Sequence, residues 1–463
     1  MKLMKKILCT VFASALFISQ GFADYNKEGI PDSTEVRKKL IDSWLTAPVA
    51  DLQKKNPELY EDGIGTVFQV RAEEGYDSVF IIVSPRGYQN VTFVREDGEQ
   101  VMQVAAYERG APGSWVLTRN KSTGKPENIQ WYFNKDASVY VQFKPVGSKT
   151  YADLIVMGMY AARSVAVGVP FNRLYTASFA DIKRWTEKSL PWGNVSVVTG
   201  QYRDVLTMIQ IIREKIPSID YASDLCYNED GKLYSIFKNK PFTLTNEEDG
   251  TEYEPEDNGR LSLSGAGFIK WIIDGIVEPV SGKGTVIGEM VQPTVDFSST
   301  GKNGVISQEA SITFALDWVR NLAAKAVSVR TGRTFTFENG GVDVNIKVFS
   351  SDVVNGKVTN NTSYIPDTGY EFKNLKALLY VLAVREPAWF YIAAVKQHSS
   401  VKYDEFVFAD TAVFFPYFDD SGKFGCAVFM NGKEITMEDY LSLYNNAYIH
   451  LERVKSTEYF YPR

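Results

Sequence analysis

The chain has 463 residues, of which 44% are hydrophobic and 13% aromatic, so it is long enough to bury the cores of two or three domains. Its formal charge of −6 opposes long-range attraction to nucleic acid or to an anionic membrane surface, so neither is expected as a partner. Only two histidines and three cysteines are present, without the spacing of zinc ligands, and no cofactor is expected.

The amino terminus has the order of a cleavable export signal. Three lysines precede the apolar run Ile7 to Ile18, and Gly21 and Ala23 occupy the −3 and −1 positions before Asp24. The apolar run is about half as long as a helix that crosses a bilayer. We therefore expect residues 1–23 to be a signal peptide. The mature protein is then periplasmic or extracellular, has no integral membrane segment and carries a formal charge of −9.

Removal of this segment also removes Cys9, so the mature chain keeps Cys226 and Cys426. In an oxidising compartment these two could form a disulfide, but two separately buried thiols fit the sequence equally well.

The next segment predicts a β-rich domain over residues 24–150. A helix from Asp32 to Trp44, capped by Asp32 or Ser33, precedes short strands separated by Gly, Asp or Pro. Glu96-Asp97-Gly98 fits a tight hairpin turn. This spacing is typical of an antiparallel β-sandwich-like domain. The expected strands are Thr66–Arg71, Ser78–Ser84, Asn90–Arg95, Val101–Ala106 and the alternating run around Val139, Val141 and Phe143.

Residues 151–219 predict a mixed connecting region, and residues 220–463 an α+β domain. The fold class expected for the whole chain is therefore α+β. Expected helices are Ser178–Ser189, Gln201–Lys215, Ser264–Val277, Ser307–Val327 with Ser307 as N-cap, and Phe372–Val384. A hairpin turn is expected at Phe337–Gly341, and strands at Trp389–Val395, Glu405–Phe415, Phe424–Phe429 and Tyr448–Val454.

The most informative segment runs from Leu263 to Trp271, Leu-Ser-Gly-Ala-Gly-Phe-Ile-Lys-Trp. It resembles the nucleophile segment of NlpC-type, papain-like cell-wall peptidases, in which Asp-Cys-Ser-Gly-Phe opens a helix and a Trp follows. The resemblance places the nucleophile position at Gly265. The family's histidine, which opens a core strand, corresponds to Asp410 in Asp-Thr-Ala-Val-Phe. Glycine and aspartate cannot form a thiolate–imidazolium pair, so the resemblance implies an inactive papain-like domain in the C-terminal half.

Other residues offer chemistry of a different kind. Ser262 and Ser264 flank the vacant position but lie in no nucleophile elbow, and the only imidazoles, His398 and His450, favour structural or solvent-facing roles. Carboxylates could instead serve as a general acid and base, and the candidates are Asp404, Glu405 and Asp410.

Metal and glycan sites have weak candidates. The acidic stretch Asn246–Gly259 contains Glu247, Asp249 and Glu252, but its spacing matches no EF-hand and favours a solvated loop. If they are exposed, Trp115, Trp131 and Tyr132 could line a glycan groove, although core packing explains them equally well.

These patterns favour an exported, noncatalytic envelope protein that binds peptidoglycan peptide or another envelope protein. The binding candidates are Ser264, Trp271 and Asp410. Two alternatives remain open, namely a hydrolase of another class that acts on cell-wall peptide or glycan, and a structural or adhesive envelope module.

Overall fold

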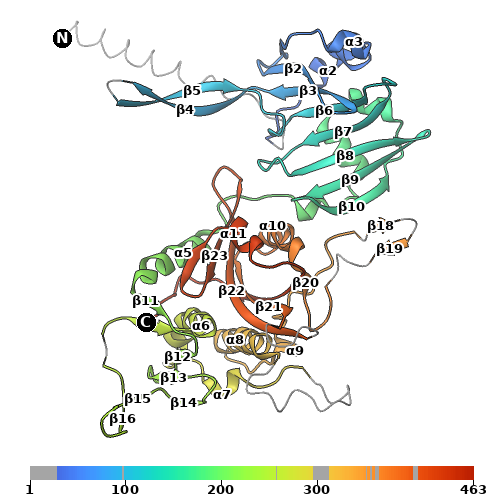
Figure 1. The fold of residues 1–463 in the computed structure, drawn as a ribbon. Coiled ribbons are helices and arrows are strands. Elements are labelled where there is room, and N and C mark those ends of the chain that lie inside the picture. The colour runs from blue at the N-terminus through green and yellow to red at the C-terminus, as the bar shows by residue number, and fades with distance from the viewer. Residues whose placement is uncertain are drawn as a thin grey trace, which may run out of the picture. The chain divides into compact units, whose positions relative to one another are not determined.

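The computed structural model describes residues 29–95, 98–256, 258–295, 312–350, 352–354, 357–359, 364–399 and 405–463. The chain divides into two compact units, Met1–Pro191 and Trp192–Arg463, and each contains helices and an antiparallel sheet (Figure 1). The predicted α+β class is thus confirmed. The expected signal peptide and the turn residues Glu96 and Asp97 lie outside the described residues.

The first unit is built on one eight-stranded sheet with the order β1-β2-β3-β6-β7-β8-β9-β10, in which each pair of neighbours is antiparallel. The antiparallel strands agree with the expectation, but they form one sheet and not the two packed sheets of a β-sandwich. Buried and exposed side chains alternate along a strand in both arrangements, so the sequence could not distinguish a sandwich from a single sheet. The last two strands extend this unit beyond residue 150. The strands are β1 (Glu58–Glu61), β2 (Val67–Glu74), β3 (Ser78–Pro85), β6 (Trp115–Asn120), β7 (Pro126–Tyr132), β8 (Val139–Val146), β9 (Lys149–Val156) and β10 (Met159–Ala166).

Short helices pack on one face of this sheet. They are α2 (Thr34–Leu40), η1 (Ile41–Leu45), α3 (Val49–Leu52), η2 (Phe171–Tyr175) and α4 (Phe179–Thr186). Ser33 caps α2 by accepting the Val36 N–H, and η1 continues α2 as one π-helical turn, so the predicted helix from Asp32 to Trp44 is confirmed. Arg37 of α2 donates to the Ala177 carbonyl and lies 4.6 Å from the ring of Trp131 in β7.

The tryptophans of this sheet belong to the core. Trp115 and Trp131 are fully buried and Tyr132 is 7% exposed, so the core-packing alternative is confirmed and the exposure that a glycan groove requires is absent at these residues. Trp131 and Phe179 pack with ring centroids 6.1 Å apart, which shows that the helical layer covers the aromatic face.

A separate two-stranded ribbon, β4 (Gly87–Arg95) and β5 (Gly98–Ala106), extends beyond the edge of the eight-stranded sheet (Figure 1). Several of its apolar side chains are exposed, among them Tyr88 (64%), Val94 (80%) and Val101 (65%). Among the described residues, these exposed side chains have no apolar partner in the core of the unit.

The second unit is organised around a six-stranded antiparallel sheet with the order β20-β25-β21-β22-β23-β24. Its strands are β20 (Tyr370–Glu371), β21 (Trp389–His398), β22 (Phe406–Phe418), β23 (Phe424–Met430), β24 (Lys433–Ile435) and β25 (Tyr448–Lys455). The four C-terminal strands predicted from the sequence are confirmed, and His398 is the last residue of β21.

Helices contact both faces of this sheet. On one face, Arg320 of α8 (Phe314–Thr331) reaches His450 of β25, and α6 (Gly265–Ser281) packs beside α8 against β22. On the other face, Phe414 and Phe418 of β22 contact Tyr440 of α11 (Met437–Ser442) and Tyr380 of α10 (Leu375–Arg385). Side chains two positions apart along a strand share a face, which fixes this assignment.

Small elements connect these layers. They are η3 (Trp192–Asn194), α5 (Arg203–Lys215), η4 (Ile216–Ser218), β11 (Ile219–Tyr221), β12 (Leu225–Tyr227), β13 (Leu233–Ser235), β14 (Lys240–Pro241), β15 (Leu244–Thr245), β16 (Glu252–Tyr253), β17 (Leu261–Leu263), α7 (Ile287–Met290), α9 (Phe337–Gly340), β18 (Asp352–Val354), β19 (Lys357–Thr359) and η7 (Phe372–Asn374).

Two local predictions are wrong. Helix α8 begins at Phe314, with Thr313 at the N-cap position, so Ser307 does not cap it and itself lies outside the described residues. The expected hairpin turn at Phe337–Gly341 is instead the short helix α9, because Thr336 and Asn339 form a capping box. Within the described ranges, no helix has the length and hydrophobicity needed to span a membrane.

Candidate functional site

The candidate site lies where β17 ends and α6 begins. Ser264 is the N-cap of α6, and its Oγ accepts the Gly267 N–H at 3.0 Å. The Ser264 N–H donates to the Leu225 carbonyl of β12, which fixes the helix start. The amides of the first helical turn have no acceptor within the helix and carry the positive end of its dipole. Gly265 and Ala266 therefore present donors to an acceptor group at this end.

Gly265 faces the sheet at close range. A Cβ atom at this position would lie 2.5 Å from Asn431 Oδ1 and 3.2 Å from Thr411 Oγ1. A cavity of about 110 Å³ lies here, and its lining includes Ser264, Gly265, Asp410, Thr411 and Asn431 together with Ser223, Tyr221 and apolar side chains. The structure thus brings the two predicted degenerate positions, one on α6 and one on β22, to the walls of the same cavity.

The nearest β22 side chain to Gly265 is Thr411 rather than Asp410. Asp410 contributes to the cavity wall, but its Oδ2 accepts hydrogen bonds from Gln397 Nε2 at 2.9 Å and from the Tyr444 hydroxyl at 3.1 Å. Neighbouring residues of a strand point to opposite faces, so only one of Asp410 and Thr411 can face Gly265. If the family's histidine position is matched to Thr411 in place of Asp410, a shift of one residue, the matched side chain faces Gly265. Asn431, which the sequence did not single out, completes the wall from the turn after β23.

The described lining of this cavity contains neither a thiol nor an imidazole. Cys226 is fully buried against α6 near Gly267, and burial raises the pKa of its thiol to about 12. Cys426 is also a free thiol, with its pKa raised by burial, so the two cysteines do not pair. A thiol with a raised pKa carries almost no thiolate at neutral pH, so neither cysteine is an activated nucleophile.

The remaining candidates lie elsewhere. Trp271 does not line the small cavity; its side chain stacks on Phe268 and its indole N–H donates to the Arg463 carbonyl. Ser262 lies on β17, beside a larger cavity. Asp404 lies outside the described residues.

The acidic loop around the β15–β16 hairpin binds its own polar groups. Asp249 Oδ1 accepts hydrogen bonds from the N–H and hydroxyl of Thr251, and Glu252 accepts one from Thr243. Glu247 is exposed. These carboxylates therefore accept hydrogen bonds within an exposed hairpin, which agrees with the solvated loop that the sequence favoured over a metal site.

A second cluster, which the sequence analysis missed, is buried between β25 and α8. His450 and Glu452 are both fully buried, and His450 Nδ1 lies 2.7 Å from Glu452 Oε1. The spacing of two residues in a strand was a usable signal, because it places both side chains on one face. We refer to His450, Glu452, Arg320, Asp343 and Tyr364 as the buried polar cluster.

Arg320 supplies the positive charge of this cluster. It donates to both oxygens of Asp343, at 3.2 and 2.7 Å, and lies 3.4 Å from His450 Nε2. The Tyr364 hydroxyl is 2.9 Å from the same Nε2. Since Nε2 faces two donors, the proton of the neutral ring belongs on Nδ1, which donates it to Glu452.

Burial sets the protonation of the cluster. It lowers the pKa of His450 to about 4 and raises the pKa of Glu452 to about 8, so both groups are neutral near pH 7. Ligand atoms of Asp343, His450 and Glu452 lie within 4.8 Å of one another, which suits a metal ion. However, the Arg320 guanidinium already occupies the position beside His450 Nε2 and Asp343, and a cation there would be repelled. The cluster is best described as a structural network.

Comparison with family models finds a match in the first part of the chain. Residues 26–194 match a family model described as a domain of unknown function, DUF8515, and this range corresponds closely to the first compact unit. No model of the NlpC or papain-like families matches the chain. Searches of curated proteins and of solved structures find no match either.

Proposed function

We propose that this protein is an exported, noncatalytic binding protein of the cell envelope, and that its second unit is a degenerate papain-like domain that binds a peptide. The observation that carries the proposal is the position of Gly265. It opens α6 against β22, at a cavity whose walls include Asp410 and Thr411. A papain-like enzyme would need a cysteine at the Gly265 position and a histidine at the Asp410 position.

The polarity of the cavity favours an amide-bearing ligand. The first amides of α6 can donate hydrogen bonds, and the Thr411 hydroxyl and the Asn431 side-chain carbonyl offer acceptors on the opposite wall. A peptide group has one donor and one acceptor and therefore matches both walls. Without a nucleophile, such a ligand is held and released unchanged.

The test uses the mature chain and the peptidoglycan stem tripeptide L-alanyl-γ-D-glutamyl-meso-diaminopimelate. Isothermal titration should give saturable binding, and mass spectrometry of the recovered peptide should show it intact. Gly265→Ala should weaken binding about tenfold or more, because the added methyl falls 2.5 Å from Asn431 Oδ1 and displaces this side chain of the cavity wall.

Gly288→Ala is the matched control, since a Cβ at residue 288 of α7 meets no atom within 4 Å. Equal loss of binding in both variants would contradict the proposed site. Cleavage of the peptide by the wild-type protein would contradict the noncatalytic role.

The β4–β5 ribbon favours a second candidate, in which the first unit is an adhesive module. Its exposed side chains Tyr88, Val94 and Val101 offer a contact surface for an envelope protein. Pull-down with the Val94→Lys variant checks this role: a partner captured by the wild type should be lost. Capture that persists in the variant would argue against the ribbon.

A further inference from the structure

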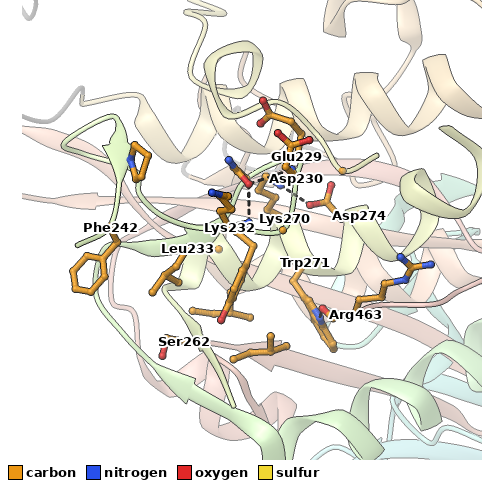
Figure 2. A pocket seen from close by; sticks show the side chains of 18 of the residues that line it. Glu229, Asp230, Lys232, Leu233, Phe242, Ser262, Lys270, Trp271, Asp274 and Arg463 are labelled. Atoms are coloured by element: carbon orange, nitrogen blue, oxygen red, sulfur yellow. Dashed lines mark hydrogen bonds and ion pairs between the residues drawn. The ribbon is translucent and has the colours of Figure 1, made fainter. Parts of the chain in front are cut away.

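A second, larger cavity of the C-terminal unit has no part in the proposed peptide site. It has a volume of about 910 Å³, within the range of small-molecule sites, and its described lining shares no residue with that of the cavity at Gly265. Figure 2 shows Lys270, Trp271 and Asp274 of α6 on one side of this cavity and Leu233 and Phe242 on the opposite side.

The charges that line the cavity are balanced. The described lining includes five basic and six acidic side chains. Four of these basic groups form ion pairs with acidic groups of the same lining, namely Lys232 with Glu254, Lys270 with Asp274, Lys283 with Asp230 and Arg463 with Glu278. A charged ligand would gain little net attraction here and would compete with these internal pairs. A neutral ligand that donates and accepts hydrogen bonds suits the lining better.

The α6 wall presents a buried ammonium to this cavity. The Lys270 side chain is 1% exposed, and the acceptor of its Nζ among the described residues is Asp274 Oδ2. The other oxygen of Asp274 accepts the Thr285 N–H at 2.7 Å. An ammonium has three donors, so Lys270 retains hydrogen-bonding capacity for an uncharged oxygen of a ligand.

Apolar rings interrupt the polar lining. Tyr227, Trp271 and Phe242 belong to the wall, and Tyr227 and Phe242 are partly exposed. Flat apolar rings beside many donors and acceptors match a sugar ring, which has apolar C–H faces and a rim of hydroxyl groups.

We propose that this cavity binds a neutral oligosaccharide, with ring stacking near Phe242 and Tyr227 and hydroxyl groups bound by the Lys232 and Lys270 ammonium groups and their paired carboxylates. This site is separate from the peptide cavity at Gly265, and its failure would leave that proposal intact.

The test is isothermal titration of the mature protein with three probes: cellotetraose, maltotetraose and tetra-N-acetylchitotetraose. At least one should bind saturably. Phe242→Ala should weaken that binding about tenfold, and Lys232→Gln should weaken it several-fold, since Lys232 is exposed and its loss leaves the fold intact. Tyr253→Ala is the control, because this aromatic residue on β16 is 49% exposed and is not part of the lining.

Absence of binding for all three probes at about 10 mM would overturn the proposal, since useful sites bind more tightly than that. Binding that is unchanged in both Phe242→Ala and Lys232→Gln would also overturn it. A third outcome is that Phe242→Ala abolishes binding of the stem tripeptide while Gly265→Ala leaves it unchanged. The larger cavity is then a peptide site, and the oligosaccharide proposal is wrong.

Discussion

The buried polar cluster makes the stability of the second unit depend on pH in a specific way. Burial raises the pKa of Glu452 from 4.5 to about 8 and lowers that of His450 from 6.5 to about 4. The folded state therefore binds more protons than the unfolded state at Glu452 between pH 4.5 and 8. At His450 it binds fewer protons than the unfolded state between pH 4 and 6.5.

The signs of the two effects are opposite. A raised folded-state pKa makes stability fall as pH rises through the window, and a lowered one makes stability rise. Each bound proton corresponds to about 1.4 kcal/mol per pH unit. Between pH 4.5 and 6.5 the two contributions cancel. Above pH 6.5 only Glu452 continues to titrate, so its loss of stability up to pH 8 amounts to about 2 kcal/mol.

Glu452→Gln isolates this effect, because it keeps the shape of the side chain and removes its ionisation. Urea unfolding of the mature wild type and the variant should be compared at pH 5, 6.5 and 8. The wild type should lose about 2 kcal/mol of unfolding free energy between pH 6.5 and 8 relative to the variant. Between pH 5 and 6.5 the variant should gain about 2 kcal/mol, since the rise in stability from His450 is no longer opposed.

Parallel pH profiles of the two proteins would refute this reasoning. They would mean that Glu452 is ionised in the folded protein at neutral pH, and that the Arg320 charge outweighs burial.

Three further outcomes follow from packing and burial. Arg320→Met should lower the unfolding free energy by about 3–5 kcal/mol in urea titrations, because it leaves a largely buried carboxylate without its partner; a loss below about 1 kcal/mol would contradict the role of the ion pair. Gly267→Ala should cost about 1–3 kcal/mol, since its Cβ would lie 2.3 Å from the Leu225 carbonyl oxygen, whereas Gly288→Ala should be neutral or stabilising. Cys226 and Cys426 should resist a thiol reagent at pH 8 in the folded protein, and both should react in denaturant. A peptide containing both cysteines joined by a disulfide in a nonreducing digest would contradict this prediction.

Local patterns predicted the longer helices of both units and the four long C-terminal strands, but they did not predict β1, β6, β7, β9 and β10 of the first sheet. The helix at residues 203–215 and the strands of the C-terminal sheet have a clear apolar period and clear end signals, and the structure has them within a few residues of the expected bounds. The start of α8 and the short helix α9 were missed. Helix α9 depends on a capping box at Thr336, and the same Asn-Gly-Gly residues also suit a hairpin turn.

The site was predictable only in part. The Gly-rich start of α6 was visible in the sequence, and so was the strand that faces it. Which side chain of that strand approaches Gly265 depends on strand pairing, and one residue of register separates Asp410 from Thr411. The contribution of Asn431, and the contact of Arg320 with His450, join residues more than one hundred positions apart, which no local pattern encodes.

Backbone hydrogen–deuterium exchange of the mature protein, with and without the stem tripeptide, tests the central claim most directly. The claim predicts that the ligand slows exchange in peptides that cover the start of α6, at Gly265 and Ala266, and the neighbouring part of β22 at Asp410 and Thr411. Gly265→Ala should abolish this protection while Gly288→Ala preserves it. Protection confined to other elements, or none at saturating tripeptide, would contradict the claim that this cavity is a peptide-binding site.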